Sequence, residues 1–249
     1  MSTIQFPEHD YVSPGLERIK PDEFFPNMYI EDIANCTWSY ARRNYHHNFY
    51  CDTRLPGCGF VNRDEAHILY NTALLFKGKA ALEIGCFFGW SACHLALGGV
   101  MLDVIDPGLG DPVVSKSVID SLRGAGVLDR VKLRVGKSPH AVTVLGDSTR
   151  RTWDLIFIDG NHNFPAPVND AVICEEYASP DCMILFHDLY SPNVTEGLRY
   201  LHDRGWKTKI YYTSQVMGVA WRGNVHPIEH TPDPTANWDI PQHLKDFPI

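Results

Sequence analysis

Residues 81–91 carry the sequence Ala81-Leu82-Glu83-Ile84-Gly85-Cys86-Phe87-Phe88-Gly89-Trp90-Ser91. This pattern predicts a buried strand that ends in a glycine-containing turn and leads directly into a helix. Glycine has no Cβ and tolerates positive φ, so such a turn lets the backbone approach a bound polar cofactor closely. The two glycines are four residues apart, whereas the dinucleotide-binding fingerprint is G-x-G-x-x-G. The spacing therefore argues against a nicotinamide-dependent oxidoreductase.

The length and composition of the chain are typical of one globular protein. It has 249 residues, of which 44% are hydrophobic, and this is enough for a full core. No apolar run reaches the roughly 18 residues that cross a bilayer, and the first residues do not resemble a signal peptide, so we expect a cytoplasmic protein without a membrane partner. The net charge of −8 predicts that nucleic acid is not a partner. The seven cysteines have irregular spacing, which argues against a disulfide framework.

Residues 1–58 are predicted to form an N-terminal arm followed by a helical cap. Prolines interrupt the first 30 residues, which favours an extended arm. Asn62 and Glu65 have the spacing of a capping box, and they predict the start of a further helix. Over about 31–50, apolar and aromatic residues recur at loosely helical spacing and predict a helix in the cap: Ile33, Trp38, Tyr40 and Tyr45.

Residues 59–222 are predicted to form the main domain, a Rossmann-like, doubly wound α/β fold. Its first strands are continuous apolar runs, as in parallel strands that are covered on both faces. A hairpin at 209–212 and 216–221 is expected to add an antiparallel strand to a mostly parallel, seven-stranded sheet. The tail at 223–249 is expected to be irregular. The preceding strands are expected at 80–85, 101–105, 131–135, 153–158 and 182–187, with helices between them.

Polar residues or glycines follow all five of these predicted strands. In open α/β sheets, ligands bind outside the carboxyl ends of the strands, so these residues are expected to share one site. Asp106 follows the second strand, where its carboxylate can accept hydrogen bonds from both hydroxyls of a ribose. The alternative role for Asp106 is to cap the turn or helix at Pro107-Gly108.

Asp159 and Asp188 follow two strands that we expect to be neighbours, about 4.8 Å apart. Adjacent carboxylates repel one another unless a proton or a cation lies between them. The pair therefore predicts a site for a divalent ion such as Mg²⁺, with His187 as a third ligand, although imidazole suits Mn²⁺, Fe²⁺ or Zn²⁺ better. The alternative is that both acids only cap helices. His162, three residues after Asp159, is predicted to be a general base near neutral pH.

Three motifs together, E-I-G-C-F-F-G-W-S, D-G-N-H and F-H-D, give residues 59–221 a resemblance to a known family. The chain resembles small-molecule class I S-adenosylmethionine (SAM)-dependent O-methyltransferases, in particular enzymes that tailor antibiotics and sugars and, more distantly, catechol O-methyltransferase. It departs from them after the fifth strand, where His187-Asp188 replaces their acidic pair. The resemblance implies His162 as the base and Asp159 and Asp188 as metal ligands, beside His187. The residues assigned to the cofactor are Glu83, Gly85, Phe87, Gly89 and Ser91 near its methionine part, Asp106 on the ribose, Ser138 near the adenine, and Asp159.

The function that we predict is methyl transfer to a hydroxyl group of a small-molecule acceptor. Two other functions stay open: a SAM-binding sensor or cyclase that does not methylate, and a zinc module formed by His46, His47, Cys51 and Cys58, although its cysteine spacing is wider than in usual zinc sites. The oligomeric state is also open, and relatives of this kind are often dimers. Aromatic residues of the cap would form a lid over the acceptor or would pack in the cap or a dimer contact: Trp38, Tyr40, Tyr45, Phe49 and Tyr50.

Overall fold

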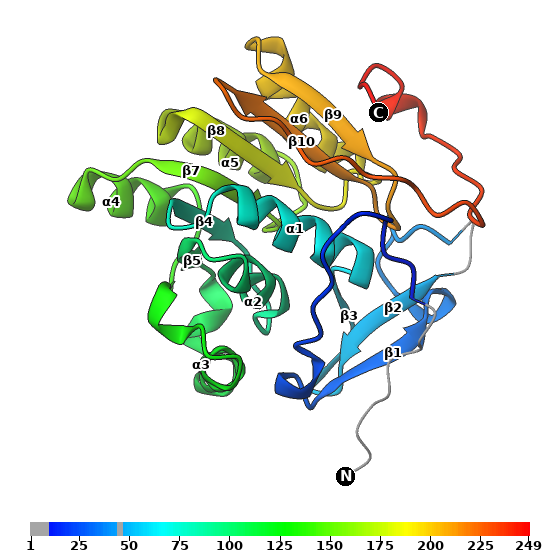
Figure 1. Ribbon diagram of the computed structural model, residues 1–249, viewed down its shortest axis with the longest axis horizontal. Coiled ribbons are helices and arrows are strands. Elements are labelled where there is room, and N and C mark those ends of the chain that lie inside the picture. The colour runs from blue at the N-terminus through cyan, green and yellow to red at the C-terminus, as the bar shows by residue number, and fades with distance from the viewer. Residues whose placement is uncertain (1–9, 44–46) are drawn as a thin grey trace.

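A seven-stranded sheet forms the centre of the computed structural model, which describes residues 10–43 and 47–249 (Figure 1). The strand order is β6-β5-β4-β7-β8-β10-β9, and β10 alone runs antiparallel to its neighbours. This order confirms the predicted Rossmann-like sheet with its C-terminal hairpin. The strands are β4 (Ala80–Ile84), β5 (Met101–Ile105), β6 (Val131–Arg134), β7 (Trp153–Ile158), β8 (Ala178–Phe186), β9 (Lys207–Tyr211) and β10 (Met217–Arg222).

Helices cover both faces of this sheet, which explains why its central strands carry apolar side chains on both faces. In β7, Leu155 and Phe157 face one hydrophobic core, and Ile156 and Ile158 face the other. Within the described residues, no helix is long and apolar enough to cross a membrane. The first core includes α1 (Arg63–Leu75), α2 (Trp90–Leu97) and α3 (Pro112–Gly124), and the second includes α4 (His140–Thr149), α5 (Ala166–Glu176) and α6 (Pro192–Asp203).

The N-terminal cap contains a three-stranded antiparallel sheet, so the helix predicted over 31–50 is wrong. The sheet consists of β1 (Met28–Asp32), β2 (Asn48–Asp52) and β3 (Leu55–Phe60). The spacing of the aromatic residues resembles a helical period, but aromatic residues also favour strands, and Tyr50 pairs with Ile30 across the sheet. Tyr45 lies outside the described residues, and β3 spans the domain boundary that we predicted at 58/59.

The start of α1 holds both the N-terminal arm and the C-terminal tail. The predicted capping box is present: the Asn62 side chain accepts from the Glu65 N–H, and the Glu65 carboxylate accepts from the Asn62 N–H, each at 2.8 Å. Asp64 accepts from the Ser13 N–H at 2.8 Å and lies 2.7 Å from Nε2 of His230. The tail beyond β10 is irregular, as predicted, apart from a short 3₁₀ helix at Gln242–Leu244.

Candidate functional site

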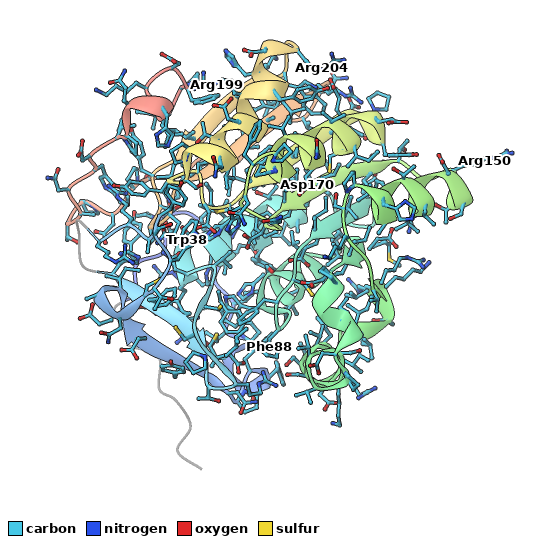
Figure 2. All side chains as sticks on the ribbon, turned by 180° about the vertical axis from the view of Figure 1, so that it is seen from behind. Trp38, Phe88, Arg150, Asp170, Arg199 and Arg204 are labelled. Carbon is cyan, nitrogen blue, oxygen red and sulfur yellow. The ribbon has the colours of Figure 1, made fainter. Side chains whose placement is uncertain are left out.

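A cavity of about 1020 Å³ lies at the carboxyl ends of the parallel strands. The structure brings residues from five separate strand ends to its lining: Gly85, Asp106, Ser138, Asp159 and Asp188. Figure 2 shows Trp38 and Asp170, which also line the cavity, near the centre of the molecule, while Arg150, Arg199 and Arg204 lie at its edge.

The glycine turn after β4 packs directly against the end of β7. Gly85 has a φ of +85°, and a Cβ on it would lie 2.1 Å from the backbone oxygen of Asp159. Only glycine fits at this position, because any side chain would collide with backbone. Gly89 also has a positive φ, +87°, and immediately precedes α2, but it does not line the cavity.

Glu83 supports the turn from beneath. Its side chain is fully buried and accepts a hydrogen bond from the Ser91 hydroxyl, and burial raises the pKa of Glu83 well above its usual value. Ser91 lines the cavity, but Glu83 does not. The structure thus places Glu83 and Gly89 behind the cavity wall, where they shape the turn instead of facing a ligand.

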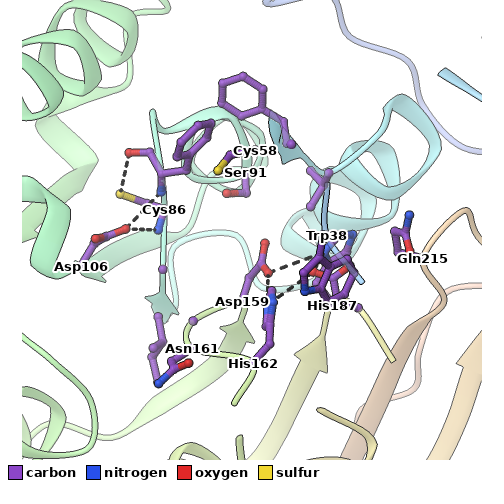
Figure 3. A pocket seen from close by; sticks show the side chains of 18 of the residues that line it. Trp38, Cys58, Cys86, Ser91, Asp106, Asp159, Asn161, His162, His187 and Gln215 are labelled. Carbon is purple, nitrogen blue, oxygen red and sulfur yellow. Dashed lines mark hydrogen bonds and ion pairs between the residues drawn. The ribbon is translucent and has the colours of Figure 1, made fainter. Parts of the chain in front are cut away.

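Asp106 ties together the two backbone turns beside the cavity (Figure 3). One carboxylate oxygen accepts from the Cys86 N–H at 2.7 Å and from the Phe87 N–H at 3.1 Å. The other accepts from the Gly108 N–H at 2.6 Å, so the capping role that we considered is present. A carboxylate offers about four acceptor positions, so this one keeps capacity for a ligand hydroxyl.

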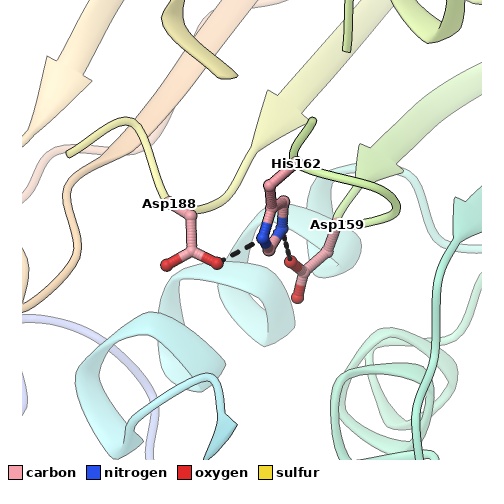
Figure 4. Close-up of side chains that lie close together, drawn as sticks. All are labelled: Asp159, His162 and Asp188. Atoms are coloured by element: carbon pink, nitrogen blue, oxygen red, sulfur yellow. Dashed lines mark hydrogen bonds and ion pairs between the residues drawn. The ribbon is translucent and has the colours of Figure 1, made fainter. Parts of the chain in front are cut away.

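Asp159, His162 and Asp188 converge in the cavity (Figure 4). Nε2 of His162 lies 3.3 Å from Oδ1 of Asp159 and 3.4 Å from Oδ2 of Asp188. Burial lowers the pKa of His162, but the charges of Asp188 and Asp159 outweigh it and raise the pKa above 6.5. Potential ligand atoms of the three residues all lie within 4.8 Å of one another, close enough for one metal ion.

His187 lies behind this group and connects it to Glu65. Its Nδ1 is 3.1 Å from Oδ2 of Asp188 and 3.5 Å from Oδ1 of Asp159, and its Nε2 is 3.1 Å from Oε2 of Glu65. Burial would raise the pKa of Glu65, but the charge of His187 lowers it to about 2. Burial would lower the pKa of His187, but Asp188, Asp159 and Glu65 raise it well above 6.5. In the sequence, Glu65 is recognisable only as part of a helix cap, because no local motif connects it with a histidine 122 residues away.

The loop before β2 contacts His162 through Trp38. The Trp38 ring lies 5.3 Å from the His162 ring between centroids, and Trp38 and Phe49 both line the cavity. Tyr40 contacts Trp38 but does not line the cavity, and Tyr50 is buried beside Asp10. Two of the predicted aromatic residues therefore line the cavity, and the lid itself stays a prediction.

Arg42 anchors this loop, and sequence reasoning missed it. Its guanidinium donates to the backbone oxygens of Thr213, Asn237 and Asp239 at 3.3–3.4 Å, and it lies 4.9 Å from the centre of the Trp238 ring. Nothing near Arg42 in the sequence marks these partners, because all of them come from the last 40 residues or so of the chain.

The suggested zinc module does not form a metal-binding group within the described residues. Cys51 is buried and pairs with Gly59 in register, so the neighbouring Cys58, which is exposed, points to the opposite face of the small sheet. His46 lies outside the described residues. The group with converging ligand atoms in the described part of the chain is that of Asp159, His162 and Asp188.

Residues 82–189 match a family model described as a methyltransferase domain. In structure, the chain is similar to the O-methyltransferase TomG from Streptomyces achromogenes, involved in tomaymycin synthesis and solved with SAM: 17% identity, TM-score 0.59, 84% of this chain and 93% of that one covered. It is also similar to an O-methyltransferase from Bacillus cereus in complex with SAH (15%, 0.54, 66% and 83%). A third such structure is the SAH-bound methyltransferase PaMTH1 from Podospora anserina (18%, 0.54, 66% and 80%). Among curated proteins, no sequence matched.

The match over residues 82–189 supports the predicted methyltransferase class, and the similar structures share the predicted Rossmann-like fold. A nicotinamide-dependent oxidoreductase finds no support in these comparisons.

Proposed function

We propose that this protein transfers the methyl group of SAM to a hydroxyl group of a small-molecule acceptor. The observation that carries the proposal is the position of His162, which shares one cavity with the glycine turn and faces two carboxylates. The cavity, at about 1020 Å³, is at the upper end of the range for single-ligand pockets, and this leaves room for cofactor and acceptor together. The O-methyltransferases among the similar structures favour oxygen as the atom that is methylated.

The cofactor end of the cavity consists of Gly85–Phe87, Ser91, Asp106 and Ser138. In our proposal, the turn and Ser91 hold the methionine part of SAM, and Asp106 accepts from the ribose. Ser138 lies beside the adenine, in the part of the cavity that Asp170 also lines. Glu83 and Gly89 act indirectly, by shaping the turn.

The acceptor end consists of Trp38, Phe49, Asp159, His162 and Asp188. Aromatic walls on one side and charged groups on the other suit a small organic molecule that presents a hydroxyl to His162. In the division that we propose, residues 1–58 form a cap at this end, 59–222 bind SAM, and 223–249 form the tail. A cytoplasmic location, a homodimer and the absence of nucleic-acid and membrane partners stay predictions.

A divalent metal ion fits the acceptor end. The donor set of two carboxylates with adjacent imidazole nitrogens is one that divalent ions use, and Nδ1 of His187 is buried without a hydrogen-bond partner. Asp159, His187 and Asp188 would hold the ion. When bound, it would lower the pKa of the acceptor hydroxyl and fix its orientation.

His162 has the position of a general base. Its Nε2 hydrogen-bonds to Asp159, which leaves Nδ1 to take the proton of the acceptor hydroxyl. The acceptor oxygen attacks the methyl carbon, the bond from carbon to sulfur breaks, and the sulfonium becomes a neutral thioether. The carboxylates of Asp159 and Asp188 stabilise the imidazolium that forms, and Trp38 limits the access of water to it.

The experiment that tests this function begins with calorimetry of metal-stripped protein and SAM, with and without Mg²⁺. We expect micromolar binding that Asp106→Ala abolishes. A panel of phenolic and sugar hydroxyl acceptors is then incubated with SAM that carries a labelled methyl group, with His162→Gln as the control. Failure to bind SAM in either condition would contradict the proposed function.

A further inference from the structure

One ring nitrogen of His187, Nδ1, is buried and has no group in hydrogen-bond geometry among the residues that the structure describes. Nδ1 lies 3.1 Å from Asp188 and 3.5 Å from Asp159, but neither contact has hydrogen-bond geometry. The side chain of His187 is only 6% exposed, so no bulk water satisfies this nitrogen. Buried polar atoms nearly always have a partner, and here the two nearest polar groups are carboxylates. A cation that all three side chains share would be such a partner.

The spacing of the donor atoms also suits a metal ion, which would replace the proton on Nδ1. A metal ion needs the nitrogen lone pair to point between the oxygens. Neighbouring ligands of an ion with bonds of about 2.0–2.2 Å lie roughly 2.8–3.6 Å apart. The separations of 3.1 and 3.5 Å from Nδ1 to the two carboxylates are within this range.

Glu65 fixes the orientation of His187. Its carboxylate is fully buried and is itself held by the N–H groups of Asn62, at 2.8 Å, and Gln215, at 3.1 Å. In the neutral imidazole that binds a metal ion, its contact with Nε2 of His187 places the hydrogen on Nε2 and leaves the lone pair on Nδ1. A carboxylate behind a ligating histidine is the usual outer-shell arrangement of metal sites. Glu65 lies outside the segment that matches the methyltransferase domain.

His162 is more exposed than His187 and lies in a loop, whereas Glu65 holds His187 from behind. Its side chain is 27% exposed, against 6% for His187, and it belongs to the loop that follows β7. His187, which Glu65 holds in place, is thus suited to binding a metal ion, and the more exposed His162 is suited to proton transfer.

We propose that Glu65 is a positioning residue that holds His187 as a nitrogen ligand, and that the centre therefore binds Fe²⁺, Co²⁺ or Zn²⁺ in preference to Mg²⁺. Imidazole is a good ligand for these transition metals, whereas Mg²⁺ prefers oxygen ligands and retains its water. The proposal rests on the metal-assisted form of the proposed function, and it specifies the class of metal.

The test uses metal-stripped, full-length protein titrated with Co²⁺ and with Mg²⁺, followed by calorimetry and by the visible absorption spectrum of Co²⁺. We expect Co²⁺ to bind at least about 10-fold more tightly than Mg²⁺. Glu65→Gln, which retains a capping-box residue, should weaken Co²⁺ binding by about 10- to 100-fold and alter its spectrum. His187→Gln should remove the preference for Co²⁺ and leave Mg²⁺ binding nearly unchanged.

Asp64→Asn is the matched control, because Asp64 is the adjacent buried acid of the same helix but contacts Ser13 and His230. It should bind Co²⁺ as the wild type does. Equal affinities for Co²⁺ and Mg²⁺, or equal effects of Glu65→Gln and Asp64→Asn, would overturn the proposal. SAM binding, measured on every variant, reports folding. Methyl transfer by the metal-free protein would contradict the metal proposal but not the proposed function. If the wild-type protein does not bind SAM, the proposed function itself is contradicted.

Discussion

The two ends of the cavity are constructed in different ways. At the cofactor end, turns that follow neighbouring strands meet through backbone groups: Gly85 packs on the backbone of Asp159, and Asp106 accepts hydrogen bonds from backbone N–H groups after two strands. At the acceptor end, Trp38, Glu65 and Gln215 come from distant segments and meet mainly through side chains. The cofactor end therefore follows from the order of the strands in the sheet, whereas the acceptor end depends on the packing of this particular chain.

The largest effect that we expect is at the cofactor end, from Gly85→Ala. Gly85 and Gly78 have similar φ values, +85° and +78°, but a Cβ would strike backbone only at Gly85, since nothing lies within 4 Å at Gly78. Gly85→Ala should abolish SAM binding and destabilise the protein by more than about 3 kcal/mol. Gly78→Ala should cost only about 1–2 kcal/mol. Urea denaturation and calorimetry with SAM measure both, and wild-type SAM affinity in Gly85→Ala would show that the turn does not face the cofactor.

At the acceptor end, His162→Gln should leave SAM binding intact and slow the methyl-transfer step. If His162 takes the proton, kcat should fall by about 10²- to 10⁴-fold. His140→Gln, an exposed histidine of α4 outside the cavity, should have wild-type kcat. Steady-state kinetics with saturating SAM make the comparison. A kcat within threefold, in rough terms, of the wild type would assign the proton to another group.

Trp38→Ala should affect the acceptor but not the cofactor. Loss of the ring beside His162 should raise the KM for the acceptor by about 10-fold, or about 1.4 kcal/mol, because an aromatic wall of the site is removed. Tyr40→Ala is the matched control, since Tyr40 contacts Trp38 but does not line the cavity. If both variants raise the KM for SAM instead, the cofactor end and the acceptor end of the cavity do not act independently.

Asp170, a buried acid in the cavity wall, should affect the pH dependence of stability and have the smallest effect on activity. Burial raises its pKa to about 6 from 3.8, so the folded protein holds this proton more tightly than the unfolded chain does. The stabilisation is complete below pH 3.8 and is lost as the pH rises through about 6, at about 1.4 kcal/mol per pH unit. Asp170→Asn stays neutral, so its free energy of unfolding relative to the wild type should increase from about pH 4 to about pH 7.

Urea denaturation of cofactor-free protein at several pH values measures this difference. Asp129→Asn, at an exposed position, is the control and should show no such trend. A constant difference between Asp170→Asn and the wild type would mean that water enters this part of the cavity.

The same contrast explains what the sequence can and cannot predict. Continuous apolar runs such as Leu155–Ile158 identify the sheet, and the order of strands and helices brings Asp106, Asp159 and Asp188 to one edge. The small N-terminal sheet was missed because its pairs, such as Ile30 with Tyr50, are not local in the sequence. Glu65 was found as a helix cap but not as the partner of His187, because its second role exists only in the folded protein.

Arg42 gives the protein an order of assembly. A chain made from its N-terminus has synthesised the whole matched domain once residue 189 has left the ribosome. The loop that carries Trp38 can be anchored only later, because Arg42 donates to the backbone of Asn237 and Asp239 near the end of the chain. Domains tend to fold as units during synthesis, so we expect the proposed cofactor end to form first and the loop over the proposed acceptor end to be anchored last. The proposed acceptor end would then be complete only when nearly the whole chain has been made.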